Sequence, residues 1–211
     1  MRLLTEIQHK KHVVWDWNGT ILDDVQHAVN TMNVLLDGHD LPLIDIVTYR
    51  QIFEFPVKKY YDKLGFDYSK CSFERLCGDF IDCFMAEFGD CRPFHSMPAI
   101  LSSLNTNGQV QSVLSATDQV NLDKMVDHFG FGDYFDFVYG IDNKIAASKL
   151  QRGFELLQNS PIPSNDTVLI GDTLHDLEVG KALGIDVVLV THGHQCQSIL
   201  CRRHDTVISM S

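Results

Sequence analysis

The sequence has few basic residues. Its 211 residues include 17 lysines and arginines against 28 aspartates and glutamates, which gives a formal net charge of −11. Such a chain is repelled by nucleic acid and by anionic membranes, so we expect neither as a partner. An anionic substrate would need a local source of positive charge, either a metal ion or a few lysines. A small phosphorylated metabolite therefore remains possible as a ligand.

Long apolar runs are also missing. No run approaches the roughly 20 consecutive apolar residues of a membrane span. Residues 1–11 are polar and lack the apolar segment of a secretory signal. We therefore expect a cytoplasmic protein. The oligomeric state is unknown from the sequence.

Metal-binding patterns of cysteine and histidine are absent too. The six cysteines form no Cys-x-x-Cys pair, and the ten histidines show no His-Glu-x-x-His spacing. We expect reduced, mostly half-buried thiols. His192 and His194 flank a glycine after an apolar run. We interpret that segment as an ordinary loop, with a minor substrate contact as the alternative.

What the sequence does contain is an alternation of apolar runs and segments of helical periodicity. We expect strands at 13–17, 110–115, 137–139, 167–170 and 187–190, and helices between them at 97–105, 120–129, 149–158 and 176–183. Strands that alternate with helices predict a parallel sheet with right-handed crossovers, hence an α/β fold. Asp118 should cap the helix at 120–129, and Gly130 should end it. Residues 198–211 are expected to add a short helix and a strand.

The first two expected strands are separated by far more residues than one crossover needs. Most of this stretch has helical periodicity. We therefore expect an α/β core domain from residues 1–23 and 93–211, and a helical cap domain from residues 24–92. An insertion that follows directly on the end of the first strand is well placed to act as a lid.

Chemically useful residues follow the strands on either side of that insertion. The first strand ends at Asp16, and Asn18, Gly19 and Thr20 come next. Ligands of α/β proteins bind at the carboxyl ends of the strands, and glycine allows a sharp turn there. Ser115 closes the second strand, where a hydroxyl and free backbone N–H groups suit an anion.

Two further elements complete the pattern. Lys149 follows the third expected strand, where it could neutralise a phosphoryl group. Asp172 and Asp176 follow the fourth, and two carboxylates at that spacing suit a hard cation. Each element alone has an ordinary explanation: Asp16 as a strand-to-turn aspartate, and the Asp172–Asp176 segment as a capped helix start. The combination, in this order and each after a separate strand, is far more specific.

With these elements the chain resembles the haloacid dehalogenase superfamily of phosphohydrolases over essentially its full length. The similar segments are Asp16-Trp17-Asn18-Gly19-Thr20 for the first motif, Ser115 for the second, Lys149 for the third and Gly171-Asp172-Thr173-Leu174-His175-Asp176 for the fourth. Residues 177–184 are similar to the phosphoglycolate phosphatase-like branch. The resemblance implies a Rossmann-like parallel sheet with an inserted helical cap.

The resemblance also implies a mechanism, in which a small phosphate monoester is hydrolysed with the help of Mg²⁺. Asp16 would be the nucleophile and would form an aspartyl phosphate. Mg²⁺ would be held by Asp16, Asp172 and the backbone carbonyl of Asn18. Asp176 would sit beside the cation, as a ligand through water or as an orienting group.

The remaining site residues are expected to bind the substrate. Ser115, the amide of Ala116 and Lys149 would hold the phosphate oxygens. Lys149 would also favour the ionised form of Asp16. In the expected cap, Arg50 and Lys58 could meet a carboxylate or second phosphate, as phosphoglycolate would require. The alternative is that they form a solvated basic face over an aromatic cluster.

Asn18 departs from the phosphatase pattern, which has an aspartate at this position to protonate the leaving alkoxide. An amide cannot exchange a proton at neutral pH, and general acid–base catalysis contributes about 10²–10⁴-fold. One hypothesis is a phosphatase with a good leaving group or a substitute acid, for which Asp23, Asp24, His27 and a cap residue are candidates. A second is a slow enzyme or switch whose aspartyl phosphate persists.

A third hypothesis is a pseudophosphatase that binds phosphorylated ligands without turnover. A pure interaction protein is the competing class. It would predict an exposed apolar patch or a charged tail, and neither is apparent in the sequence.

Overall fold

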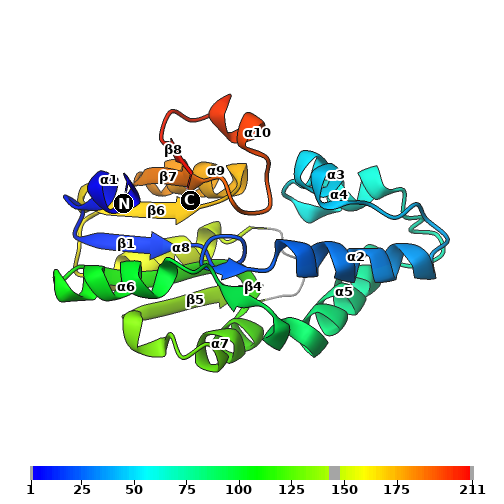
Figure 1. Ribbon diagram of the computed structural model, residues 1–211, viewed down its shortest axis with the longest axis horizontal. Coiled ribbons are helices and arrows are strands. Elements are labelled where there is room, and N and C mark those ends of the chain that lie inside the picture. Colours follow the sequence, from blue (N-terminus) through cyan, green and yellow to red (C-terminus); the bar gives the residue numbers. More distant parts are fainter. Residues whose placement is uncertain (1, 143–147, 210–211) are drawn as a thin grey trace.

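A six-stranded parallel sheet forms the centre of the molecule (Figure 1). The structure, a computed structural model, describes residues 2–142 and 148–209. The strand order is β5-β4-β1-β6-β7-β8. The strands are β1 (His12–Trp15), β4 (Val110–Asp118), β5 (Phe137–Ile141), β6 (Thr167–Gly171), β7 (Asp186–Val190) and β8 (Val207–Ile208). The expected α/β fold is confirmed, and the final short helix and strand are present.

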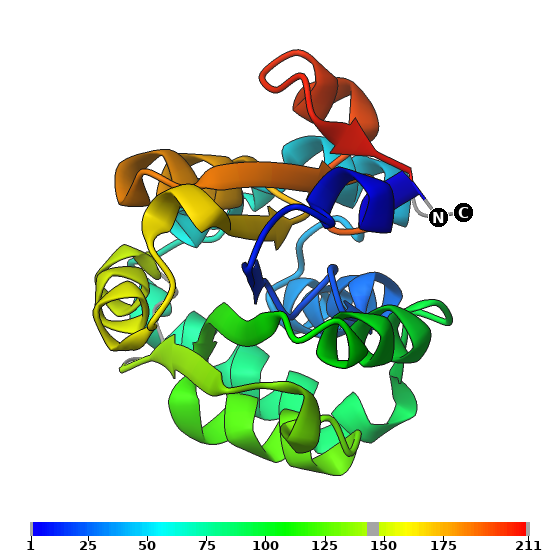
Figure 2. The same cartoon turned by 90° about the vertical axis from the view of Figure 1, so that its left-hand side faces the viewer.

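Helices cover both faces of the sheet (Figure 2). They are α1 (Arg2–Ile7), α6 (Met97–Thr106) and α7 (Gln119–His128) on one face, α8 (Leu150–Asn159) and α9 (Leu174–Leu183) on the other, and α10 (Gln197–Cys201) near β8. Short 3₁₀ helices span Phe88–Asp90, Gly132–Tyr134 and Ser164–Asp166. Val13 and Trp15 join one apolar cluster and Val14 joins the other. Since successive side chains of a strand point to opposite faces, β1 must be apolar throughout, as its sequence is.

The helix α7 begins and ends as expected, but the strand before it, β4, is longer than expected. The Asp118 side chain accepts a hydrogen bond from the backbone N–H of Asn121 (3.2 Å), and Gly130 has a φ of +69° just beyond α7. The strand itself continues past Ser115 to Asp118, with an irregular register against β5 after Leu114. Polar residues at its end made the strand look shorter in sequence.

The stretch between the first two core strands is helical. Its helices are α2 (Val25–Gly38), α3 (Ile46–Ile52), α4 (Val57–Leu64) and α5 (Phe73–Glu87). We call residues 24–92 the helical insertion. It leaves and rejoins the core through two adjacent antiparallel strands, β2 (Leu22–Asp23) and β3 (Arg92–Pro93). Figure 1 shows it beyond the arrowheads of β1 and β6, at the carboxyl edge of the sheet.

Two expectations from composition can be compared with this fold. All six cysteines are free thiols. None of the helices in the described parts of the chain is both long enough and apolar enough to span a bilayer.

His12 carries a polar contact in the interior of the core. Its Nε2 hydrogen-bonds the Ser112 hydroxyl (2.7 Å) and its Nδ1 the Ser160 hydroxyl (3.0 Å). Burial lowers the pKa of His12 from 6.5 to about 4, although Asp136 opposes the shift. Below pH 6.5 the unfolded chain therefore binds a proton that the folded chain excludes.

We predict that His12 lowers the free energy of unfolding by about 3 kcal/mol as the pH drops from about 6.5 to about 4. His12→Gln removes this contribution, so over that window its free energy of unfolding should fall by about that much less than that of the wild type. His9→Gln changes an exposed histidine and keeps the buried imidazole, so it is the matched control. Urea unfolding at a series of pH values measures both. Equal slopes for His12→Gln and the wild type would contradict the assignment.

Candidate active site

The site lies at the point where the strand order of the sheet reverses. β1 is flanked by β4 on one side and β6 on the other, so the chain crosses from one neighbour to the other around it. A crevice at the carboxyl ends of the strands forms at such a switch point. Asp16 directly follows β1, and its backbone N–H still donates to the carbonyl of Ile170 in β6 (2.8 Å). Asp172 follows the end of β6 and thereby comes next to Asp16.

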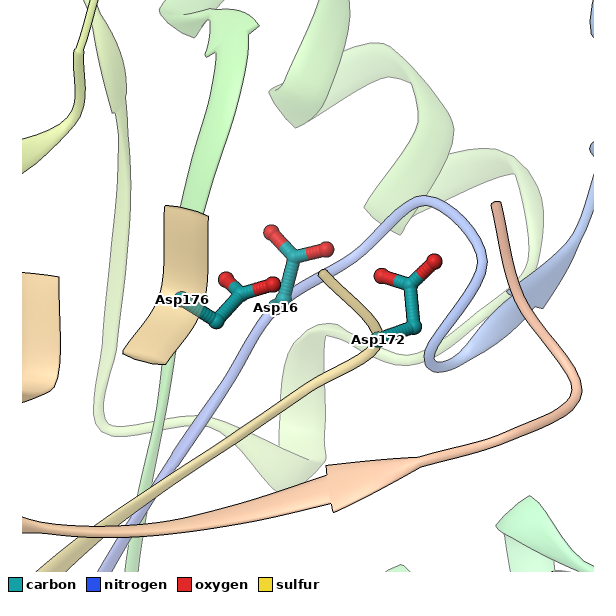
Figure 3. A group of neighbouring side chains, drawn as sticks. All are labelled: Asp16, Asp172 and Asp176. Atoms are coloured by element: carbon teal, nitrogen blue, oxygen red, sulfur yellow. The ribbon is translucent and has the colours of Figure 1, made fainter. Parts of the chain in front are cut away.

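Three buried carboxylates meet at this edge. Asp16, Asp172 and Asp176 each offer an oxygen within 4.8 Å of the others. Figure 3 shows Asp16 in the middle, with Asp172 on one side and Asp176 on the other. Asp176 also caps α9, because its Oδ2 accepts from the backbone N–H (3.0 Å) and the hydroxyl (2.7 Å) of Thr173. The capped helix start and the acidic cluster therefore coexist.

Lys149 supplies positive charge to this cluster. Its side chain is 1% exposed, and its Nζ contacts the Asp16 carboxylate, lies 2.7 Å from Asp176 Oδ1 and donates to the backbone carbonyl of Leu114 (2.8 Å). Burial alone would lower the pKa of this ammonium group, but Asp16 and Asp176 raise it well above its ordinary value. Lys149 is therefore fixed as a cation beside the candidate nucleophile.

One ammonium group does not balance three buried carboxylates. Burial raises the pKa of Asp16 well above its usual value despite Lys149, and raises that of Asp172 to about 6. For Asp176, Lys149 and the Thr173 hydroxyl outweigh burial and lower the pKa. With all three ionised, two negative charges remain, and buried charges are paired or bind metals. The all-oxygen donor set and this excess charge fit a hard divalent cation such as Mg²⁺.

Asp172 is held by close approach of two loops. Its Oδ1 accepts from the Thr20 hydroxyl (3.2 Å), and its Oδ2 accepts from the backbone N–H of His194. A Cβ at Gly19 or Gly193 would collide with this carboxylate. Gly19 also has a φ of +69°, which disfavours other residues. Both glycines are therefore required for the position of Asp172.

Both polar atoms of the Asn18 amide form hydrogen bonds. Its Nδ2 donates to Asp24 Oδ2 (2.7 Å), and its Oδ1 accepts from the Thr117 hydroxyl (2.8 Å). An ionised carboxylate has no hydrogen to donate to Asp24. The surroundings of residue 18 therefore suit an amide, which offers a donor and an acceptor together.

Asp24 in turn links the core to the helical insertion. Its Oδ1 accepts from the backbone N–H of Gly19 (2.8 Å) and lies 3.3 Å from Nε2 of His194. Burial would lower the pKa of His194, but Asp24 raises it to about 9. The Nδ1 of the same ring hydrogen-bonds the hydroxyl of Tyr49 in α3 (2.8 Å).

Further hydrogen bonds hold the helical insertion against the carboxyl edge of the sheet. Arg50 donates to the backbone carbonyls of His192 (2.7 Å) and Gly193 (2.8 Å), and the Gln195 side chain donates to the carbonyl of Phe53 (2.9 Å). These bonds join α3 and the residues after it to the loop that follows β7.

A cavity of about 190 Å³ lies between the core and the insertion. The predicted catalytic, metal-binding and phosphate-binding residues all line it, namely Asp16, Asn18, Ser115, Ala116, Lys149, Asp172 and Asp176. Thr117 and Tyr49 line it as well, and sequence reasoning did not single them out. The proximity of Thr117 to Ser115 was the one available signal. His194, interpreted from sequence as part of an ordinary loop, also lies in this wall.

The structure does not bring Arg50 and Lys58 into the cavity wall. The Arg50 guanidinium is engaged by the two loop carbonyls. Lys58 lies on the exposed side of α4, over the Tyr68 ring (3.7 Å to its centre) and 3.4 Å from Asp62. This placement resembles the alternative of a basic face over aromatic residues.

The structure places the named candidates for a substitute proton donor at different positions relative to the cavity. Asp24 lines the cavity beside Asn18. Asp23 is exposed in β2. The His27 ring hydrogen-bonds the carbonyl of Phe84 (2.9 Å) and is absent from the lining.

Comparison with known proteins identifies the family. Residues 13–190 match the family model of the haloacid dehalogenase-like hydrolases, and the chain belongs to that family. Its relatives include a phosphoglycolate phosphatase of Caulobacter vibrioides, 24% identical over 206 residues (93% of this chain, 85% of the relative). Another is the tyrosine-protein kinase PtkA of Mycobacterium tuberculosis, 23% identical over 201 residues (93% and 67%).

Solved structures show the same fold. A haloacid dehalogenase-like hydrolase of Streptococcus pneumoniae superposes with a TM-score of 0.82 at 18% identity, covering 97% of this chain and 95% of the other. A predicted phosphatase of Clostridium acetobutylicum gives 0.80 at 20% identity, covering 96% and 94%.

We predict that Mg²⁺ raises the thermal unfolding temperature of the protein, because a cation bound only by the folded state stabilises it. Asp172→Asn should fold, since it removes one of several buried like charges, but its response to Mg²⁺ should shift to at least about tenfold higher concentration. Asp127→Asn makes the same change on the exposed side of α7 and should respond like the wild type. An unchanged response of Asp172→Asn would remove this residue from the cation site.

Proposed function

We propose that this protein is a Mg²⁺-dependent phosphatase that acts on a small phosphate monoester through an aspartyl phosphate at Asp16. The observation that carries the proposal is the arrangement of the carboxylates and Lys149. One ammonium group contacts the candidate nucleophile, which is itself one of three buried carboxylates that converge on one cavity. The phosphoglycolate phosphatase among its relatives supports the same class of reaction.

The proposal gives each residue a role at the phosphate. Bound Mg²⁺ would draw charge from the phosphoryl oxygens and offset their repulsion of the carboxylate. Asp16, Asp172 and the backbone carbonyl of Asn18 would hold it, with Asp176 beside them. An oxygen of Asp16 attacks phosphorus, the bond to the leaving oxygen breaks, and water later releases inorganic phosphate.

Other residues of the cavity would bind the transferred phosphoryl group. Lys149 would neutralise one phosphate oxygen, and the Ser115 hydroxyl and the Ala116 amide would hold the others, since all three residues line the cavity. We infer that residues 24–92 act as a cap that excludes water from this reaction. Its closed contacts to the loop after β7 support this role.

Asn18 limits the rate in this proposal, because no proton donor stands two residues after the nucleophile. It also sustains the alternative of a slow or non-catalytic protein that binds phosphorylated ligands. Both hypotheses need the same phosphate site, so only turnover distinguishes them.

The direct test is Mg²⁺-dependent release of phosphate from a broad panel of esters that includes 4-nitrophenyl phosphate. We expect release that EDTA stops and that Asp16→Asn abolishes, since the amide is not a nucleophile. If the panel shows no release while Mg²⁺ and phosphate still stabilise the fold, the non-catalytic alternative is correct.

We predict that Asn18→Asp raises kcat for an alkyl phosphate by about 10²–10⁴-fold. The new carboxyl group must be protonated to donate to Asp24, and the neighbouring carboxylate raises its pKa, which suits a general acid. Asn30→Asp makes the same change on the exposed side of α2 and should leave kcat unchanged. A variant no faster than the wild type would show that proton donation at this position is not limiting.

A further inference from the structure

The cavity wall that faces the phosphate site is apolar and aromatic. From the helical insertion it includes Met32, Phe53, Phe55, Ile81, Phe84 and Met85. The whole cavity, including the phosphate site, has a volume of about 190 Å³, and an apolar cavity of about 150 Å³ accommodates benzene. The cavity therefore suits a small substrate, and the wall above the nucleophile offers an apolar and aromatic surface to the organic part of that substrate.

The same wall offers no cationic group from the insertion. Among the described residues, the basic side chains of the cavity wall are Lys149, His175 and His194. Lys149 faces two carboxylates, and His194 is paired with Asp24. The His175 ring stacks on Phe55 of the insertion, with the ring centres 4.5 Å apart. A carboxylate on the organic part of a substrate would be buried there without a cation from the insertion to balance its charge.

Two polar atoms in this wall can still meet a neutral group. The Tyr60 hydroxyl and Nε2 of His175 are both buried and have no hydrogen-bond partner within the described residues. Buried polar atoms are normally paired, and both residues line the cavity, so a polar group of a ligand that reached these atoms would complete their hydrogen bonds. They allow a neutral polar substituent.

Asn18 also favours an aromatic substrate, because of the chemistry of the leaving group. Without a proton donor, the leaving oxygen must depart as an anion. A phenol, with a pKa of about 10, forms that anion far more readily than an aliphatic alcohol. An aromatic alcohol therefore fits both the apolar surface of the wall and the missing acid.

We propose that the substrate of this site is the phosphate monoester of an uncharged phenol. The inference rests on the proposed phosphatase function and names its substrate class. An Asp16 carboxylate oxygen forms a bond to phosphorus as the phosphorus–aryl oxygen bond breaks. The phenoxide leaves with that electron pair and takes a proton from solvent. Water then cleaves the aspartyl phosphate to inorganic phosphate and regenerates the carboxylate.

The test compares kcat/KM for phenyl phosphate, benzyl phosphate and phosphoglycolate in the presence of Mg²⁺. This ratio reports the steps up to phosphoryl transfer, so slow hydrolysis of the intermediate does not obscure it. We expect phenyl phosphate to exceed benzyl phosphate at least about tenfold, because the ring is retained and the leaving group changes. We expect benzyl phosphate to exceed phosphoglycolate by a similar factor. Phosphoglycolate as the best of the three would overturn the inference.

Ile81 tests the wall itself, since this half-buried residue of α5 lines the cavity. Ile81→Lys should lower kcat/KM for phenyl phosphate and raise it for phosphoglycolate, which reverses the preference. Ile81→Met keeps the wall apolar and should retain the wild-type order. Val34→Lys adds the same charge to the exposed side of α2, where Val34 is 61% exposed, and should also retain it. A preference that does not respond to Ile81→Lys counts against the assignment.

Failure of the phosphatase proposal would leave a different signature. In that case none of these esters, nor 4-nitrophenyl phosphate, would be hydrolysed. The substrate class is then measured by binding of the non-hydrolysable analogues benzylphosphonate and 3-phosphonopropionate, titrated with Mg²⁺ present. At least about tenfold tighter binding of benzylphosphonate supports the inference without turnover. Equal or weaker binding contradicts it.

Discussion

The burial of three carboxylates against a single ammonium group is the constraint on which the rest of this structure depends. Asp16 follows β1, whereas Asp172 follows β6 and Asp176 lies in the first turn of α9, and the pairing of β1 with β6 brings them together. Lys149 offsets part of their charge, and the remainder is what a divalent cation would balance. The glycines that touch Asp172 and the cap at Asp176 serve this arrangement.

Asn18 connects that electrostatic constraint with substrate choice. Its amide is held between Asp24 and Thr117, and Asp24 reaches through His194 to Tyr49 of the helical insertion. Asn18, whose amide cannot transfer a proton to the leaving group, therefore belongs to the network that closes the insertion. A site that cannot protonate its leaving group must receive a substrate whose leaving group needs no proton, and the aromatic wall is suited to one.

The sequence predicted the strands, the helical insertion and the carboxylates because each has a local signal. Apolar runs mark β1 and β6, and Asp16 and Asp172 stand directly after them. The sequence could not place Arg50 or the Tyr49–His194 contact, since these depend on how the insertion docks on the loop after β7. The strand predicted from the sequence also ended at Ser115, three residues too early. The polar residues that follow resemble a turn, although Asp118 still pairs with Ile141 of β5.

The most direct test of this account is whether Asp16 becomes phosphorylated during turnover. The protein would be mixed with Mg²⁺ and phenyl phosphate, quenched in acid and reduced with borohydride, which converts an aspartyl phosphate to homoserine. Peptide mass spectrometry would then locate the change. The account predicts homoserine at position 16 in the wild type and none without substrate. Phosphate release with Asp16 unmodified, or with homoserine at another aspartate, would contradict it.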